Sequence, residues 1–298
     1  MATTLLTDIL ESGSEDQIAY QGGQRYVARL LPSRLKPSQT FTLHPNGCYW
    51  ITGGLGSLGL RVAQWLITQG ARYLILTGRH APFAQAQNLI DQWQESSTHI
   101  LIKQADVANE SEIKTVLETL NHPLRGIIHA AGTLGYDSLP EISLIRLQSV
   151  LRAKVQGAWL LHQLTQNQPL DFFVCFSSIA SVWGSKKQAH YAAANHFLDG
   201  LAHYRHALGL PGLSINWGWA KGGMASGEAQ SVLKRMGVEA LSPEKALQAF
   251  GYLLTTQSCQ NTVADINWPV FKAIYTAQKP RPLLEQLEIQ AFASTHPQ

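Results

Sequence analysis

Short apolar runs alternate along most of the chain with longer segments of helical periodicity. The apolar runs are predicted as strands, and they cover residues 48–52, 73–78, 100–107, 126–132, 171–178 and 213–220. The clearest periodic segments are predicted as helices, and they cover residues 60–70, 143–165 and 185–209. Uninterrupted apolar strands are typical of a sheet that is buried on both faces. The alternation therefore predicts an α/β fold: a Rossmann-type doubly wound parallel sheet with helices on both faces.

The ends of the chain do not follow this alternation. Two short β-like runs flank Gly22 and Gly23 and predict a hairpin, and a stretch rich in proline and polar residues follows it. Residues 221–237 begin with glycines and have weak periodicity, which is typical of a mobile lid, and residues 261–271 could add a last strand. We therefore expect three parts: a hairpin with a linker over 1–45, the main domain over 46–285, and a tail or linker over 286–298.

Composition narrows the class of protein further. The 298 residues are 45% hydrophobic and 14% charged, and no apolar run is long enough to span a bilayer. The net charge of +3 comes without a basic block, so the sequence does not suggest a nucleic-acid partner. Cys48, Cys175 and Cys259 form no CxxC pair, the N-terminus does not resemble a signal peptide, and the histidines show no metal-ligand spacing. We expect a cytoplasmic protein that binds neither a membrane nor a metal.

A glycine-rich turn connects the first predicted strand of the main domain to its first helix. Gly54, Gly56 and Gly59 have the GxGxxG spacing that lets a pyrophosphate approach a helix N-terminus, although an ordinary βα turn can also be glycine-rich. Arg79 directly follows the second predicted strand, where NAD-preferring folds carry an acidic residue, so we expect NADPH unless Arg79 is only a solvated loop residue. Asp106 could accept a hydrogen bond from the adenine amino group, or it could simply cap a turn.

A second group of polar residues follows the fifth predicted strand. Ser177 and Ser178 end that strand, and Tyr191 stands four residues before Asn195 in the alanine-rich run "QAHYAAANHF", so that the last two share one helix face. A phenol with an ordinary pKa near 10 needs a nearby cation to act as an acid or base close to neutral pH. The run contains no lysine. Lys154, in an earlier helix, is the candidate for that cation.

With these residues the chain resembles the ketoreductase domains of modular polyketide synthases, a branch of the short-chain dehydrogenase/reductase family. Ordinary members of that family carry Tyr-x-x-x-Lys with an upstream asparagine, whereas the polyketide branch exchanges the two, as Lys154 and Asn195 do here. The resemblance runs from about Cys48 to about Leu284. Its motifs, in order, are "TGGLGSLG", "LTGR", "ADV", "HAAG", "KVQGAW", "FSS", "YAAAN", "NWGW", "GGM", "LSPEKAL" and "VADINW".

The resemblance implies a role for each catalytic candidate. Tyr191 protonates the ketone oxygen while NADPH delivers hydride to the carbonyl carbon, and Ser178 donates a hydrogen bond to the same oxygen. Lys154 favours the tyrosinate form and contacts the nicotinamide ribose, and Asn195 helps to hold Lys154 and the proton path. Ser177 is less favoured because the family position, thirteen residues before the tyrosine, is Ser178. Each residue alone also fits a plain structural role, and only their joint occurrence favours catalysis.

The resemblance also implies the cofactor contacts and the partners. The substrate is a β-ketoacyl thioester on the phosphopantetheine arm of an acyl carrier protein, and the other domains of a polyketide synthase are further partners. Residues 1–45 correspond to the remnant of a structural subdomain. The implied NADPH contacts are Thr52, Gly53, Gly54, Gly56, Ser57, Leu58, Gly59, Thr77, Arg79, Asp106, Val107, Ala130, Ala131, Gly132, Lys154 and Tyr191.

Four positions bear on stereochemistry in the family. B-type domains carry Leu-Asp-Asp where this chain has Leu134 followed by glycine and tyrosine, whereas A-type domains carry a tryptophan eight residues before the catalytic tyrosine, as Trp183 does here. Gln188 takes the place of the histidine that marks the second A subtype, and Met224 belongs to the same substrate-facing set. The sequence therefore predicts an A1-type enzyme that forms an L-β-hydroxyl group.

Two other classes of function remain open. The chain could be a free-standing short-chain reductase of a small ketone, but the exchanged lysine and asparagine argue against this. It could also be a non-catalytic module that binds NADPH, but such modules usually lose a catalytic residue or the glycine loop, and this sequence keeps both.

Overall fold

The computed structural model describes the chain except for residues 1, 11–12, 34–35, 38–39, 220–226 and 288–298. Contacts divide the chain into two compact units. The larger unit comprises Leu35–Gly227 and Ala240–Ala264, and the smaller unit comprises Met1–Arg34, Glu228–Glu239 and Asp265–Gln298. All the site residues predicted from the sequence fall within the limits of the larger unit. Met224 is the one predicted site residue that lies outside the described residues.

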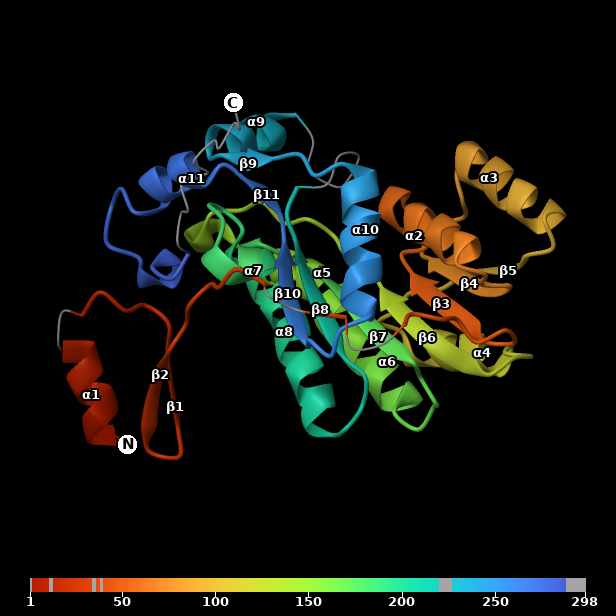
Figure 1. The fold of residues 1–298 in the computed structure, drawn as a ribbon, viewed down its shortest axis with the longest axis horizontal. Helices are drawn as coiled ribbons and strands as arrows, with labels where there is room; N and C mark the ends of the chain where they lie inside the picture. Colours follow the sequence, from red (N-terminus) through yellow and green to blue (C-terminus); the bar gives the residue numbers. More distant parts are fainter. Residues whose placement is uncertain (1, 11–12, 34–35, 38–39, 220–226, 288–298) are drawn as a thin grey trace, which may run out of the picture. The chain divides into compact units, whose positions relative to one another are not determined.

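A seven-stranded parallel sheet forms the centre of the larger unit (Figure 1). Its order is β10-β8-β7-β6-β3-β4-β5, so the strand order reverses between β3 and β6, and in sheets of this kind ligands bind at that reversal, beyond the carboxyl ends of the strands. The predicted doubly wound fold is confirmed. The strands are β3 Cys48–Thr52, β4 Tyr73–Gly78, β5 His99–Gln104, β6 Leu124–His129, β7 Phe172–Ser178, β8 Leu213–Trp217 and β10 Gln260–Val263.

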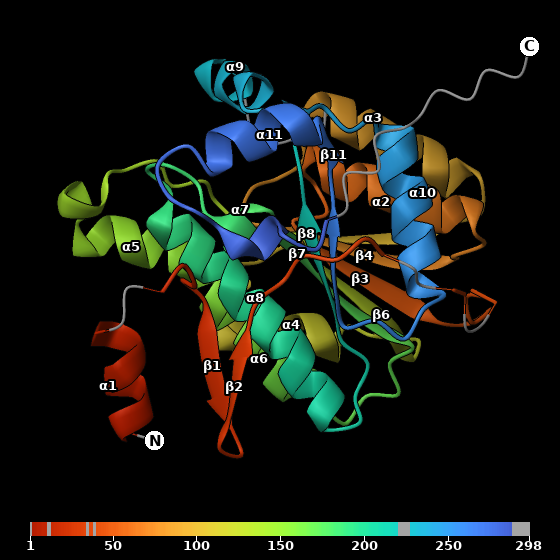
Figure 2. The ribbon, with the colours of Figure 1, turned by 60° about the vertical axis from the view of Figure 1, so that its left-hand side comes forward.

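Helices cover both faces of this sheet (Figures 1 and 2). Side chains alternate along β3, so that Tyr49 and Ile51 pack into the core on one face while Trp50 packs into the core on the other. The first core is closed by α2 Ser57–Thr68, α3 Ala84–Glu95 and α10 Pro243–Leu254. The second core is closed by α4 Glu110–Glu118, α6 Ala158–Thr165 and α8 Ala189–Ala207.

The segment predicted as one helix over residues 143–165 is not a continuous α-helix. It consists of α5 Leu144–Leu151, a π-helical turn over Arg152–Gly157, and α6. Both Lys154 and Gly157 are buried in the π turn, and a Cβ at Gly157 would lie 2.6 Å from Cγ1 of Val107. The wider turn therefore brings Lys154 inward where the helix lies against the loop after β5. Such turns inside α-helices are frequent at functional sites.

Short elements complete the larger unit. The 3₁₀ turn η1 Leu139–Glu141 and the short helix α7 Ala180–Trp183 follow β6 and β7, and the sequence predicted neither. In the described part of the chain, no helix combines the length and the apolar character needed to cross a bilayer.

The smaller unit contains the predicted hairpin, which pairs β1 Ile18–Gln21 with β2 Gln24–Val27 in antiparallel register. A helix that the sequence did not predict, α1 Ala2–Leu10, precedes it. The last strand expected over residues 261–271 is split, because β10 joins the large sheet whereas β11 pairs with β9 in the smaller unit. The remaining elements are α9 Glu228–Arg235, β9 Val238–Glu239, β11 Asp265–Ile266, α11 Trp268–Tyr275 and η3 Pro282–Leu284.

Candidate active site

The glycine loop between β3 and α2 has the geometry of a phosphate-binding turn. Gly53 has a φ of +68°, a conformation that L side chains rarely adopt. A Cβ on Gly59 would lie 2.4 Å from the carbonyl oxygen of Gly53, so this position also requires glycine. Gly56 precedes the first turn of α2 in an extended conformation, and no side chain caps that turn. The N-terminus of α2, at Ser57, can therefore receive an anion.

Two arginines affect Asp106, which lies just beyond the end of β5. The Asp106 Oδ1 atom accepts a hydrogen bond from the amide of Ala108 at 2.9 Å, so this aspartate does cap a turn, and Oδ2 accepts one from Nε of Arg152 at 3.1 Å. Burial by itself would raise the pKa of Asp106, but these two hydrogen bonds and the charges of Arg152 and the exposed Arg79 hold the pKa below its usual value. Sequence reasoning missed Arg152, although it stands two residues before Lys154.

Two predicted cofactor contacts have side chains that are already paired within the sheet. The Thr52 hydroxyl lies 2.8 Å from Nδ1 of His129, and the Thr77 hydroxyl accepts a hydrogen bond from Nε1 of Trp50 at 3.1 Å. Both threonines are almost fully buried. They can reach a bound cofactor through their backbone atoms rather than through their hydroxyl groups.

The "HAAG" segment lies between the glycine loop and Lys154. A Cβ on Gly53 would lie 2.8 Å from the amide nitrogen of Ala131, next to the carbonyl group of Ala130. A Cβ on Gly132 would lie 2.8 Å from Cε of Lys154. These close approaches bring the loop, the end of β6 and Lys154 to one place. The other apolar residues of the predicted set, one partly buried and one buried, are Leu58 and Val107.

Lys154 is a buried cation with a single hydrogen-bond partner in the described part of the chain. Its side chain is nearly inaccessible, and Nζ donates a hydrogen bond of 2.8 Å to the carbonyl oxygen of Phe176 in β7. Burial lowers the pKa of Lys154 from 10.5 to about 8. Nζ lies 5.9 Å from the centroid of the Tyr191 ring. The two residues predicted to act together are therefore neighbours, although they come from different helices.

Tyr191 lies in α8, close to Ser178 and Asn195. Burial raises the pKa of Tyr191, and hydrogen bonds with the side chains of Ser178 and Asn195 act in the opposite direction. The amide nitrogen of Asn195 also donates to the Tyr191 carbonyl oxygen at 2.7 Å, while its buried Oδ1 atom has no donor among the described residues. The structure therefore brings together the four residues Lys154, Ser178, Tyr191 and Asn195.

Ser177 points into a different cluster, which we call the Asp199 network. Its members are Ser177, Ser181, Asp199, Ser214 and Asn216. Asp199 accepts hydrogen bonds from Ser181 Oγ at 2.7 Å, Ser214 Oγ at 2.6 Å and Asn216 Nδ2 at 2.8 Å. Ser177 Oγ donates to a backbone carbonyl of α8 at 3.1 Å and accepts from Asn216 at 3.0 Å. The network fastens α8 to β7 and β8. The sequence analysis missed this network, although Ser214 and Asn216 are polar residues in an otherwise apolar predicted strand.

The residues predicted to control stereochemistry lie on three segments. Trp183 ends α7 and is buried, whereas Leu134 is 42% exposed in the loop after β6. Gln188 precedes α8, accepts a hydrogen bond from Ser185 at 2.6 Å, and donates from Nε2 to the carbonyl oxygen of Gly135 at 3.5 Å. Gln188 thus joins the start of α8 to the loop that carries Leu134. Met224 lies outside the described residues.

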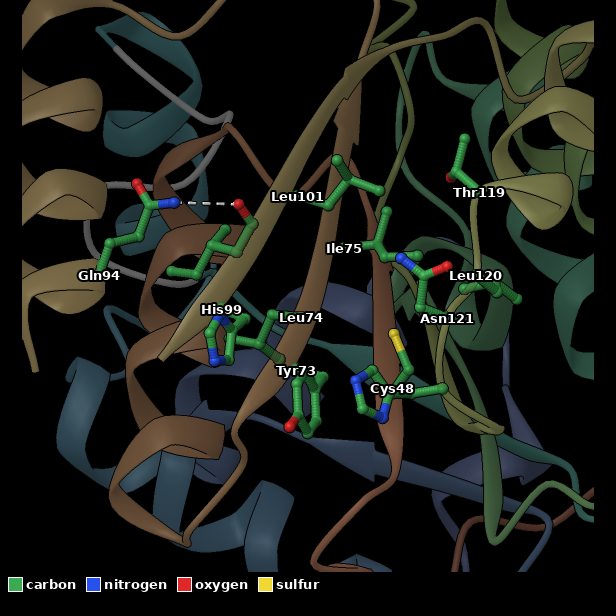
Figure 3. A pocket seen from close by; sticks show the side chains of 12 residues that line it. Cys48, Tyr73, Leu74, Ile75, Gln94, His99, Leu101, Thr119, Leu120 and Asn121 are labelled. Carbon is green, nitrogen blue, oxygen red and sulfur yellow. Dashed lines mark hydrogen bonds between the residues drawn. The ribbon is translucent and has the colours of Figure 1, made fainter. Parts of the chain in front are cut away.

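A cavity of about 620 Å³ lies at the opposite end of the sheet (Figure 3). It is lined by the first residues of β3, β4 and β5 and by the end of α4, and Gln94 donates a hydrogen bond to the carbonyl oxygen of Ile100 at its rim. The ring of Tyr73 stacks on those of His99 and His122, with centroids 5.2 and 3.4 Å away. Because parallel strands begin at the same edge, this cavity is separate from the residues at the carboxyl ends of the strands.

Comparison with known proteins matches the part of the chain that contains the four catalytic candidates. The family model described as the KR domain matches residues 47–222. The chain is 38% identical over 280 residues to the polyketide synthase GfsA of Streptomyces halstedii, which covers 92% of this chain and 4% of that protein. It is 35% identical over 288 residues to the pikromycin polyketide synthase component PikAIII of Streptomyces venezuelae, which covers 94% of this chain and 18% of that protein.

Solved structures agree with these relatives. An A1-type ketoreductase superposes with a TM-score of 0.91 at 35% identity, over 96% of this chain and 62% of the other. An A-type ketoreductase from a modular polyketide synthase superposes with a TM-score of 0.90 at 36% identity, over 96% of this chain and 61% of the other. The chain thus spans under two thirds of these two solved chains and less than a fifth of the two synthases.

Proposed function

This chain belongs to the KR domain family, and from that premise we propose that it is an A-type ketoreductase of a modular polyketide synthase. It reduces a β-ketoacyl thioester to the L-β-hydroxyacyl thioester with NADPH. The observation that carries this proposal is the convergence of Lys154, Ser178, Tyr191 and Asn195 beside the glycine loop.

The residues present suit NADPH. Gly56 leaves open space before the N-terminus of α2, because the nearest atom to an added Cβ would be the Gly53 oxygen at 3.4 Å. The pyrophosphate would bind there, and the positive groups of Arg79 and Arg152 near Asp106 suit a 2′-phosphate. Bound NADPH would supply the hydride that reduces the carbonyl carbon.

The chain's own residues would handle the carbonyl oxygen and its proton. Ser178 would donate a hydrogen bond to the oxygen as negative charge develops on it. Tyr191 keeps its proton in the buried site because its pKa is raised, and it would transfer that proton to the same oxygen. The Lys154 ammonium would stabilise the tyrosinate that remains, and the open Oδ1 of Asn195 would accept a hydrogen bond along the path that returns the proton.

The substrate and the partners follow from the relatives rather than from a contact in this structure. The relatives are multidomain polyketide synthases, so we propose that an acyl carrier protein presents the substrate on its phosphopantetheine arm and that other synthase domains act with this one. Trp183, Gln188, Leu134 and Met224 would select the face of the ketone that is reduced. The three free cysteines suit a reducing cytoplasm.

The proposal is tested by measuring NADPH oxidation by the purified chain with a β-ketoacyl thioester, presented once on an acyl carrier protein and once as a free thioester. We expect turnover of both, with a higher kcat/KM for the carrier-bound form. Equal use of the two forms would favour a free-standing reductase. NADPH binding without turnover across a broad panel of ketones would identify a non-catalytic module.

Stereochemistry needs a separate measurement. A racemic α-methyl-β-ketoacyl thioester should yield chiefly the product with an L-hydroxyl and an unepimerised D-methyl group, as resolved by chiral chromatography. A D-hydroxyl product would contradict the A-type proposal while leaving the reductase proposal intact.

The cofactor preference can be tested at Arg79. Removal of its positive charge in Arg79→Ala should lower kcat/KM for NADPH about tenfold and leave the value for NADH nearly unchanged, because only NADPH carries the 2′-phosphate. Arg72→Ala is the matched control, since Arg72 is also exposed but precedes β4 at the other end of the sheet. An unchanged NADPH preference in Arg79→Ala would refute this role.

A further inference from the structure

Two segments meet at the start of the helix that carries Tyr191. One is the loop over residues 133–138 after β6, which we call the β6 loop, and the other is the entry to α8 over residues 184–190. The amide of Asp137 donates to the Lys187 carbonyl oxygen at 2.8 Å, and Gln188 Nε2 donates to the Gly135 carbonyl oxygen at 3.5 Å. The β6 loop leaves the carboxyl end of its strand, where ligands bind in such sheets. The position of the β6 loop is therefore expected to affect how a substrate binds.

His190, next to Tyr191 in the chain, fills the space between these two segments. Its side chain is fully buried, and Nε2 lies 3.4 Å from Oδ2 of Asp137. A Cβ on Gly135 would lie only 1.8 Å from Nε2, and it would also lie 2.7 Å from Cγ2 of Val150. No side chain can be added at residue 135 while the imidazole is in place. Glycine at residue 135 and histidine at residue 190 thus form one complementary contact.

The contact extends to a third element. Asp137 lies 3.5 Å from the guanidinium of Arg146 in α5, so the carboxylate stands between an imidazole on one side and an arginine on the other. Both nitrogens of the buried His190 ring lack a hydrogen bond among the described residues. A buried polar ring in that condition is destabilising unless the nearby carboxylate compensates. The Asp137 carboxylate is therefore what holds the ring, and through it the β6 loop, in place.

We propose that His190 is a positioning residue that fixes the β6 loop against the start of α8 and thereby sets the orientation of the ketone above Tyr191. The inference rests on the proposed function and adds a specificity determinant to it. His190 and Tyr191 are consecutive on a helix, so their side chains diverge by about 100°. His190 therefore acts through the loop and not on the reacting oxygen. Exposed Leu134, beside Gly135, is the side chain whose position it controls.

The test is a double-mutant cycle on the full chain with the racemic α-methyl-β-ketoacyl thioester. Gly135→Ala should lower kcat/KM about tenfold or more, mainly through KM, and should erode the product diastereomer ratio. His190→Ala should erode that ratio less and should remove the clash. The double variant should therefore lie much closer to His190→Ala than to Gly135→Ala, because only the 2.7 Å approach of the added Cβ to Cγ2 of Val150 remains. His190→Gln, whose side-chain amide nitrogen can take the place of Nε2 and donate a hydrogen bond toward Asp137, should recover part of the ratio.

Gly200→Ala is the matched control, because Gly200 lies in α8, the helix that carries His190, and an added Cβ at Gly200 has no heavy atom within 4 Å. It should change neither the ratio nor KM. The inference is refuted if Gly135→Ala leaves the ratio unchanged, if the two single effects simply multiply in the double variant, or if only the melting temperature responds. A wild-type chain that binds NADPH but reduces no ketone would instead refute the proposed function together with this role.

Discussion

Lys154 and Asp199 are both buried charges in the larger unit, and their surroundings differ. Asp199 accepts hydrogen bonds from three side chains, those of Ser181, Ser214 and Asn216. Lys154 has one partner in the described part of the chain, the backbone carbonyl of Phe176, and burial lowers its pKa to about 8. The Asp199 carboxylate therefore has hydrogen-bond partners for both of its oxygens, whereas the Lys154 ammonium, which can donate three hydrogen bonds, donates one.

The difference supports a structural role for the Asp199 charge and the proposed functional role for the Lys154 charge. A buried charge that is fully hydrogen-bonded can hold elements together, and the Asp199 network joins α8 to two strands. A buried charge with too few partners destabilises the folded state, so its presence calls for another explanation. Lys154 lies beside Tyr191 and Gly132, where its charge can act on a substrate and a cofactor. Active sites commonly contain such perturbed groups.

The sharpest way to test this contrast is Tyr191→Phe. The change removes the proton donor but keeps the ring that packs in the core of the site, so kcat should fall by about 10³-fold with almost no change in stability. Steady-state reduction of the β-ketoacyl thioester and urea unfolding measure the two effects. Tyr204→Phe, at an exposed position of the same helix, is the control. Turnover that survives in Tyr191→Phe would remove Tyr191 from the proposed mechanism.

The next largest effect is expected in the Asp199 network. Asp199→Ala leaves two buried donors, Ser214 and Asn216, and the half-buried Ser181 without their shared acceptor, and it should lower the free energy of unfolding by about 3 kcal/mol. The remaining folded protein should still turn over. Asp91→Ala, at an exposed helical aspartate, should lower the free energy by less than about 0.5 kcal/mol. A loss in Asp199→Ala as small as that of the control would show that the network is not structural.

Lys154→Met should move activity and stability in opposite directions. Turnover should fall about 100-fold, because the tyrosinate loses its counter-charge. The free energy of unfolding at pH 7 should rise by about 2 kcal/mol, because removing the buried charge outweighs the hydrogen bond lost at Phe176. Lys114→Met, at an exposed lysine, should do neither. A less stable Lys154→Met variant would show that the charge is structural after all.

The stability gain of Lys154→Met should also depend on pH. Lys154 has a folded-state pKa of about 8 against an ordinary value of 10.5, so below pH 8 the native lysine is charged and its destabilisation is fully present. As the pH rises through 8 toward 10.5, the native group loses its proton before the unfolded one does. The difference between variant and wild type should therefore shrink from pH 7 to pH 9.5 in paired urea titrations. A constant difference would contradict the lowered pKa.

The smallest effects should come from two adjacent serines that belong to different clusters. Ser178→Ala should reduce kcat by about 10- to 100-fold, because Ser178 interacts with Tyr191, and it should cost only about 0.5 kcal/mol of stability for the hydrogen bond that Ser178 Oγ accepts from the Ala180 amide at 3.2 Å. Ser177→Ala should cost about 1 kcal/mol of stability through its contacts in the Asp199 network and keep most of the activity. Each serine is the control for the other. Exchanged outcomes would reassign the substrate contact to Ser177.

The sequence predicted best those features that a local pattern determines. The strands β3 and β4 match their predicted bounds to the residue, because continuous apolar runs end there in glycine or threonine at a turn. The hairpin around Gly22 was found for the same reason. Short helices such as α7 were missed, since four residues give no periodicity to detect.

Features that depend on distant contacts could not be predicted. The π turn at Lys154 lies in a sequence that has ordinary helical periodicity, and Gly157 gains its meaning only from contact with Val107. The same holds for Gly135 and His190, which are 55 positions apart in the chain and meet only after folding. The four catalytic candidates were found because the resemblance assigned them by order and spacing. Their burial and their hydrogen-bond partners required the structure.

The π turn over Arg152–Gly157 has a consequence for insertions and deletions. Its backbone closes with i→i+5 hydrogen bonds, so it holds one residue more than an α-helical turn. Deleting one residue there would let α5 and α6 join as a single α-helix, and their flanking core residues Val150 and Leu161 could keep their packing. Lys154 would then be displaced from Phe176. Deletion of a single codon in this helix should therefore leave a chain that folds but lacks the proposed activity.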